Sequence, residues 1–309
     1  MTAVYSFASL AIARALALAL RLSGRRAGLV LVYHALAERT GDPERELVPP
    51  HGIALFEAQL RHLRGCYRLV RAEELLSAVV ARRRGERFPI ALTFDDDLVS
   101  HVRLAAPILQ RVGAPATFFL CGASLERPHA FWWQRLQRAA DEGHQLPIEG
   151  RDVHEVAARV ESLSPEARDR MEEWLVQRLG PDPENEGLRS EHVNELVERG
   201  FEIGFHTLRH DRLTGLDDGA LARAMTEGRA ELEHAAARPL TAIAYPHGKA
   251  DEEVARAARE AGFVLGFTGY QRPVVRASDP MLLGRFVPAH GPVAAFALQL
   301  VRTVLWPHR

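Results

Sequence analysis

The segment Pro89-Ile-Ala-Leu-Thr-Phe-Asp-Asp-Asp97 decides how the rest of the chain is interpreted. Its first six residues form a short, mostly apolar run, of the kind found in strands that are buried on both faces. Three carboxylates follow directly, so they stand where the strand ends. Because reacting groups gather at the carboxyl ends of strands in α/β barrels, the segment predicts a buried strand that delivers acidic side chains to a site.

Six further apolar runs of strand length accompany this one, at residues 29–33, 115–121, 201–205, 241–245, 263–268 and 283–287. Segments with helical periodicity separate most of them. Alternation of strands and helices predicts a parallel sheet covered by helices. We expect an α/β fold, a distorted (β/α) barrel of about seven parallel strands, although the pattern alone also permits an open sheet.

Length and composition fit a globular barrel with a helical insertion. The chain has 309 residues, of which 47% are hydrophobic and 26% charged. We expect residues 1–27 to form an amphipathic helix and residues 28–309 to form the barrel. A polar stretch at about 124–190 has helical character and is interpreted as an insertion into the barrel. The net charge of −1 excludes a strongly basic protein, so nucleic acid is not expected as a partner.

The N-terminal helix has two alternative environments. Its arginines fall on one stripe of a helical wheel and its apolar residues on the other, with Arg14, Arg21 and Arg25 opposite Ile12, Leu16 and Ala19. Such a helix either makes peripheral membrane contact through residues 1–26 or packs on its own domain. Its basic residues do not precede the apolar core, as they do in a secretory signal. We therefore expect a cytoplasmic or membrane-associated protein, with export less expected.

Two further strand ends carry reactive side chains. His206 and His210 follow one strand, and their four-residue spacing places both imidazoles on one side of a helical turn. Two histidines and one carboxylate form a three-ligand metal site that leaves positions open for water and substrate. Asp95 and Asp96 are adjacent on extended chain, so their side chains diverge. One can bind a metal while the other accepts a proton from water.

These segments resemble the motifs of one family. Leu92-Thr-Phe-Asp-Asp96 resembles the first motif of the polysaccharide deacetylases, also called carbohydrate esterase family 4, which have the NodB-like fold. His206-Thr-Leu-Arg-His210 resembles the second motif, and Tyr245-Pro-His-Gly248 resembles the third. Leu31-Val-Tyr-His34 is similar to a strand near the start of many members. The resemblance covers roughly residues 28–300.

The resemblance implies a hydrolase that removes acetyl groups from sugars with a divalent metal, for which zinc is the expected ion. Asp96, His206 and His210 would then hold the metal, and Asp95 would be the general base. A backbone N–H in the 246–248 turn would stabilise the oxyanion. The expected substrate is an N-acetylated glycan of the cell envelope or an exopolysaccharide, or its precursor.

Several further residues are candidates for the site. His290 stands nearest to the C-terminal position of the family's general acid, and His247 replaces a usual aromatic residue and could itself donate a proton. Tyr245 and Pro246 are expected beside the substrate. His34 and Trp133 are expected there too, with packing in the core as the alternative for each.

Two positions depart from the family pattern. Asp97 stands where the first motif usually has glycine, and Ala244 stands where many members have an arginine that orients the catalytic aspartate. Asp97 could raise the pKa of Asp95 or join the metal. These departures leave two alternatives open: a non-catalytic relative that binds glycans, or a metal hydrolase of another C–N bond.

Overall fold

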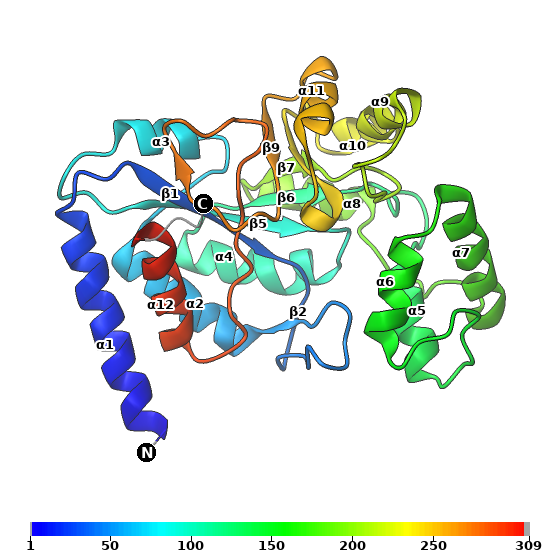
Figure 1. Cartoon of the computed structure of the whole chain (residues 1–309), viewed down its shortest axis with the longest axis horizontal. Helices are drawn as coiled ribbons and strands as arrows, with labels where there is room; N and C mark the ends of the chain where they lie inside the picture. The colour runs from blue at the N-terminus through cyan, green and yellow to red at the C-terminus, as the bar shows by residue number, and fades with distance from the viewer. Residues whose placement is uncertain (1, 306–309) are drawn as a thin grey trace.

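A twisted sheet wrapped by helices forms the body of the molecule (Figure 1). The structure is a computed structural model that describes residues 2–305, without the side chains of residues 2–8 and of Pro165. Predictions made for residues 1 and 306–309 lie outside this range. Within the described residues, seven strands run parallel: β1 (Ala27–Tyr33), β4 (Arg68–Val70), β5 (Pro89–Asp95), β6 (Thr117–Leu120), β7 (Glu202–Phe205), β8 (Ala242–Ala244) and β9 (Leu265–Phe267).

The strand order is β10-β1-β5-β6-β7-β8-β9, with β4 paired to the first half of β5. β10 (Val274–Val275) runs antiparallel to β1. The predicted strand at 283–287 forms two bridges instead, from Leu283 to Phe267 of β9 and from Phe286 to Leu31 of β1. These bridges join the two ends of the sheet, and the expected distorted barrel is confirmed. Outside it, β2 (Leu36–Ala37) pairs with β3 (His51–Gly52).

Helices cover the barrel on its outside. They are α1 (Thr2–Arg21), α2 (Ile53–Cys66), α3 (Leu75–Ala81), α4 (Ala106–Val112), α8 (Ser190–Glu198), α9 (Asp218–Thr226), α10 (Arg229–Ala235), α11 (Glu252–Glu260) and α12 (Val293–Leu305). Local sequence fixes several of their ends. Asp251, for example, caps α11 by accepting hydrogen bonds from the N–H groups of Glu253 and Val254. Among the described residues, we find no helix with the length and apolar character needed to cross a membrane.

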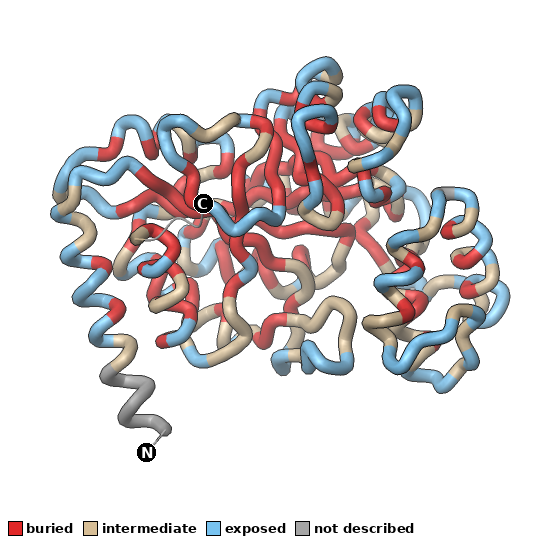
Figure 2. Tube along the Cα trace, viewed as in Figure 1, coloured by how far each residue is buried: buried red, intermediate tan, exposed pale blue. Residues whose placement is uncertain are grey.

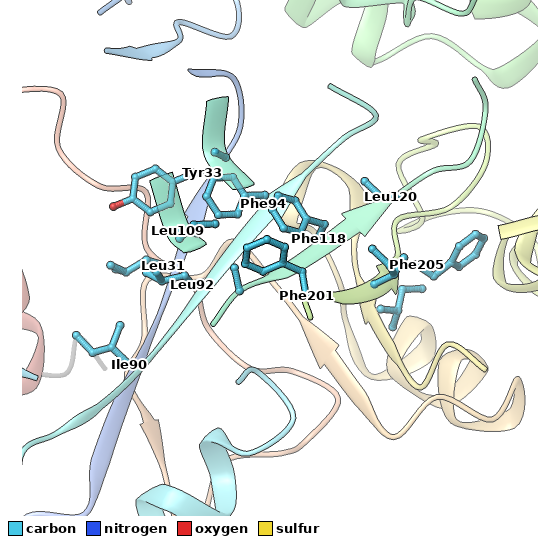
Figure 3. Packing of buried hydrophobic residues seen from close by; sticks show 14 of the residues in the cluster. Leu31, Tyr33, Ile90, Leu92, Phe94, Leu109, Phe118, Leu120, Phe201 and Phe205 are labelled. Atoms are coloured by element: carbon cyan, nitrogen blue, oxygen red, sulfur yellow. The ribbon is translucent and has the colours of Figure 1, made fainter. Parts of the chain in front are cut away.

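The strands are the most deeply buried part of the chain (Figure 2). On β5, Ile90, Leu92 and Phe94 point outward into a core under the helices, where Phe94 stacks between Tyr33 and Phe118 (Figure 3). Alternation along a strand sends the residues between them to the opposite face. Asp95 is thereby directed to the inside of the barrel, at the carboxyl end of its strand.

Three helices form a separate lobe within the segment predicted as an insertion. They are α5 (Trp132–Asp141), α6 (Val153–Glu161) and α7 (Pro165–Leu179), and they share a small apolar core of their own. Two ion pairs fasten the lobe to the loops that follow β7 and β8: Arg168 with Asp211, and Glu161 with His247. The lobe therefore stands beside the carboxyl ends of the strands (Figure 1).

One buried carboxylate should make stability depend on pH. Glu202 on β7 accepts hydrogen bonds from Thr117 and Arg71. Burial, together with the neighbouring Glu73 carboxylate, raises the pKa of Glu202 to about 7. A raised folded-state pKa means that the folded chain holds this proton more tightly than the unfolded chain. The stability from this group is therefore complete below its ordinary pKa and is lost as the pH rises through about 7.

Glu202→Gln should remove this loss, because glutamine stays neutral at every pH. We expect the melting temperature of the variant to equal that of the wild type near about pH 5 and to exceed it by about 2–6 °C near about pH 8.5. Thermal unfolding followed by circular dichroism at both pH values measures the difference. An equal effect at the two pH values would contradict this account.

Candidate metal centre and active site

Three side chains from two strand ends converge inside the barrel mouth. Asp96 follows β5, and His206 and His210 follow β7; one ligand atom of each lies within 4.8 Å of the others. Oδ1 of Asp96 is 3.6 Å from Nε2 of each histidine, and all three side chains are buried. Asp96 and His210 have positive φ angles (74° and 49°), a conformation that aspartate and histidine tolerate better than most residues.

The chemistry of this cluster fits a divalent metal ion. Nδ1 of His206 lies 2.7 Å from the carbonyl oxygen of Ala244, and because a carbonyl only accepts, Nδ1 carries the proton and Nε2 keeps its lone pair. Burial lowers the pKa of His206 to about 4 and that of His210 well below its usual value, so both rings are neutral. Oδ1 of Asp96 is buried without a hydrogen-bond partner. Two neutral imidazoles and one carboxylate are a donor set typical of zinc and related ions.

Asp95 lies beside the cluster, with Oδ2 3.8 Å from Nε2 of His206, and is oriented by Arg285. Both carboxylate oxygens of Asp95 accept hydrogen bonds from this guanidinium, each at 2.7 Å, and both side chains are buried. Burial raises the pKa of Asp95, but the charge of Arg285 and the hydrogen bonds that it donates outweigh this and lower the pKa to about 2. Asp95 is therefore an ionised carboxylate in a fixed orientation.

Arg285 is a functional residue that the sequence did not reveal. Many members of the family have an arginine at the position of Ala244 that orients the catalytic aspartate. In this chain Arg285, which is far away in the sequence, contacts Asp95 instead. The signal available was one arginine within the apolar run 282–287. Nothing in that run indicates which buried carboxylate Arg285 would bind.

Asp97 does not join the metal cluster, so that expectation is wrong, and its own φ angle is not positive. The positive φ falls on Asp96 instead. The Asp97 carboxylate accepts hydrogen bonds from the backbone N–H groups of Cys121, Gly122 and Ala123, at 2.8, 3.2 and 2.9 Å. It anchors the loop after β6, and its charge raises the pKa of Asp96 rather than that of Asp95.

A cavity of about 490 Å³ opens onto this cluster. Of the candidate residues, His34, Trp133 and His247 line it together with Asp95 and the three clustered ligands. The ring of Trp133 lies 4.4 Å from that of His210, and the ring of His247 lies 4.7 Å from it on another side. Residues from strand ends and from the helical lobe thus share one cavity.

Three candidates do not line this cavity: Tyr245 and Pro246, which were expected beside the substrate, and His290, which was expected as the general acid. The Tyr245 hydroxyl donates a hydrogen bond to the carbonyl of Met281, because alternation along β8 sends Tyr245 outward where Ala244 points inward. Pro246 is buried in the turn that follows and does not line the cavity. His290 lies beyond the barrel-closing bridges, where its ring packs on His51 at 4.0 Å.

Besides Trp132 and Trp133, the lobe supplies four lining residues that the sequence did not single out: His154, Ala157, Ala158 and Glu161. Oε1 of Glu161 lies 2.6 Å from Nδ1 of His247, and this hydrogen bond lowers the pKa of Glu161. Nε2 of His247 and Nε1 of Trp132 are buried without partners. The amphipathic period of α6 predicts a helix but gives no information on which loop it meets.

The family model of the polysaccharide deacetylases matches residues 82–184 and 167–266, which contain all three motifs. The chain belongs to the polysaccharide deacetylase family. It is 21% identical over 243 residues to YxkH of Bacillus subtilis (strain 168), covering 77% of this chain and 63% of YxkH. The chain thus spans less than two thirds of that relative's length.

Solved structures of deacetylases share this fold. The deacetylase PplD of Streptococcus pyogenes, solved in complex with acetate, superposes with a TM-score of 0.62 at 18% identity over 90% of this chain and 98% of PplD. A de-N-acetylase from Aggregatibacter actinomycetemcomitans gives a TM-score of 0.58 at 16% identity over 87% of this chain and 99% of its own. Both agree with the distorted barrel described above.

The role assigned to Asp97 can be tested with the residue that is usual in the first motif. Asp97→Gly should leave the backbone donors of residues 121–123 without their acceptor and destabilise the fold by about 2–4 kcal/mol. Metal content per folded chain should stay unchanged, because Asp97 lies outside the cluster. Chemical denaturation and elemental analysis measure the two quantities. Loss of metal with unchanged stability would show that Asp97 is a ligand.

Proposed function

We propose that the chain is a metal-dependent hydrolase that removes N-acetyl groups from a sugar of a cell-envelope or exopolysaccharide glycan, or of its precursor. The observation that carries the proposal is that two adjacent aspartates have different partners. Asp95 is held as an ionised carboxylate by Arg285, while Asp96 joins two neutral histidines. Membership of the deacetylase family supports the reaction class, and the name of the Aggregatibacter relative supports an N-linked acetyl group.

Asp96, His206 and His210 would hold the divalent ion, and zinc is the ion that we expect for this donor set. Such an ion supplies Lewis-acid polarisation of the acetyl carbonyl and lowers the pKa of a bound water. The remaining chemistry belongs to the side chains and backbone around it.

Asp95 is proposed as the general base that takes a proton from the attacking water. Its ionised form is ready to accept a proton, and Arg285 fixes the direction in which its oxygens point. The backbone N–H of His247 is proposed to stabilise the oxyanion. The neighbouring N–H groups of Gly248 and Lys249 already donate to the carbonyls of Tyr245 and Pro246, at 2.9 and 3.2 Å.

His247 is proposed as the general acid that protonates the departing amine. Its Nδ1 is held by Glu161, and its Nε2, without a partner, belongs to a side chain that lines the cavity. A carboxylate that binds one nitrogen of an imidazole fixes the orientation of the ring and so directs the other nitrogen. His34 also lines the cavity, but burial lowers its pKa and favours the neutral ring. The proposal therefore replaces His290 by His247.

The base is tested by acetate release from N-acetylglucosamine oligomers. Asp95→Asn should keep the metal and lose at least about a hundredfold in rate, because general base catalysis contributes about 10²–10⁴-fold. Glu202→Gln, which also removes a buried strand carboxylate, is the matched control and should release acetate at the wild-type rate. Bound metal with no acetate from the wild type would favour the glycan-binding alternative. Turnover of small amides but not of acetylated sugars would favour a hydrolase of another C–N bond.

The acid is tested by a set of histidine variants. His247→Gln should lower kcat by about a hundredfold, and Glu161→Gln by about tenfold, since it removes only the group that orients the ring. His290→Gln should stay within about threefold of the wild type, because its ring lies outside the cavity. Steady-state kinetics on a soluble acetylated oligosaccharide distinguish the variants. Full activity in His247→Gln, with a large loss in His34→Gln, would move the role to His34.

A further inference from the structure

Helix α1 buries two small residues and exposes three of its large apolar ones, while the half-buried Leu20 packs against the core. It lies along α12, and Ala13 and Ala17 are the side chains that this contact buries. Ile12, Leu18 and Leu22 remain 56%, 58% and 60% exposed, and Leu16 is exposed as well. In a helix that only covers its own domain, the larger apolar side chains face inward. The reverse arrangement leaves a face of α1 without a partner within the described chain.

The exposed residues form one continuous apolar face. At about 100° per residue, six exposed positions of α1 follow one another around an arc of about 160°: Leu18, Ala11, Ala15, Ala19, Ile12 and Leu16. The exposed Leu22, in the turn directly after the helix, is counted with them as the seventh. Every one of them is alanine, leucine or isoleucine. Arg14 stands at the border of this arc. We call these seven residues the apolar arc.

Exposed arginines stand at one edge of the apolar arc and near the C-terminal end of its helix. The first 37 residues contain four arginines and no acidic residue. The loop after α3 docks on the end of α1 through the N–H of Gly85, which donates to the carbonyl of Arg21 at 2.7 Å. This loop carries two more exposed arginines, Arg83 and Arg84, and one exposed acid, Glu86, whose carboxylate accepts a hydrogen bond from the N–H of Arg83. The resulting basic border consists of Arg14, Arg26, Arg83 and Arg84.

Two arginines of the stripe expected from the helical wheel, Arg21 and Arg25, already donate hydrogen bonds to the body of the protein. Arg21 donates to the carbonyl of Gly85, and Arg25 donates to the carbonyl of Val304 at 2.6 Å. They fasten the helix to the body of the protein, in agreement with the alternative that the helix packs on its own domain. That packing also fixes the orientation of the helix (Figure 1), whose apolar arc is exposed.

We propose that the apolar arc and its basic border dock the protein on the surface of an anionic lipid bilayer. A helix that lies in the membrane interface presents apolar side chains to the acyl region and basic side chains to anionic headgroups. A second copy of the chain is a poorer occupant. In a two-fold dimer through this face, the basic borders of both copies would approach each other and repel.

The test is flotation of the full chain with lipid vesicles. The wild type should bind vesicles of phosphatidylcholine containing phosphatidylglycerol, bind pure phosphatidylcholine at least about tenfold more weakly, and dissociate as salt is raised. Leu18→Glu combined with Leu22→Glu should weaken binding at least about tenfold, since two buried apolar contacts are lost. Val264→Glu is the matched control, because Val264 is 59% exposed on another surface.

The variants should keep the wild-type circular dichroism and acetate release, since α1 lies at the opposite end of the molecule from the lobe beside the cavity (Figure 1). The test does not depend on the proposed reaction. Failure of the wild type to bind the anionic vesicles overturns the proposal, as does a double variant that binds as well as Val264→Glu. A dimer that dissociates in the double variant, without vesicle binding by the wild type, would assign the face to a second copy.

Discussion

The buried pair of Arg285 and Asp95 connects the closure of the barrel to the chemistry of its mouth. Arg285 lies between Leu283 and Phe286, whose bridges join β9 to β1. The segment that closes the sheet thus delivers the guanidinium that holds the carboxylate. Removing one partner of such a pair costs about 3–5 kcal/mol, because the other charge stays buried alone. Fold and site therefore constrain each other at this position.

This constraint separates the roles of two adjacent aspartates. Asp95 is the last residue of β5 and points to the inside of the barrel, where Arg285 donates hydrogen bonds to both of its carboxylate oxygens. The chain then turns through the positive φ of Asp96, which directs the next carboxylate to His206 and His210. The Asp97 carboxylate accepts a hydrogen bond from the N–H of Cys121 and so anchors the loop after β6. Three consecutive acids thereby act as a general base, a metal ligand and a structural anchor in the proposed mechanism.

The features that the sequence predicts are those that depend on regular spacing of residues along the chain. The strand that ends at Asp95, the His206–His210 spacing and the strand–helix alternation are local, so a parallel α/β sheet and a site of two histidines and one carboxylate follow from them. The family resemblance added the NodB-like barrel and the choice of Asp96 as the ligand. The partners of these groups are distant: Arg285 and Asp95 are 190 residues apart, and Glu161 reaches His247 from the lobe. No periodicity predicts such pairs. Tyr245 shows a different failure, since motif resemblance suggested a substrate contact where strand alternation sends the side chain outward.

The central claim is that Asp96, His206 and His210 hold one divalent ion while Asp95 stays outside its coordination. X-ray absorption at the zinc edge of the zinc-loaded protein tests this most directly. We predict one ion per chain, with two imidazole nitrogens at about 2.0–2.1 Å, oxygen donors and no sulfur. The same spectrum should appear in Asp95→Asn, whereas His206→Ala should bind no ion at this site. A spectrum without imidazole, or one that changes in Asp95→Asn, would contradict the account.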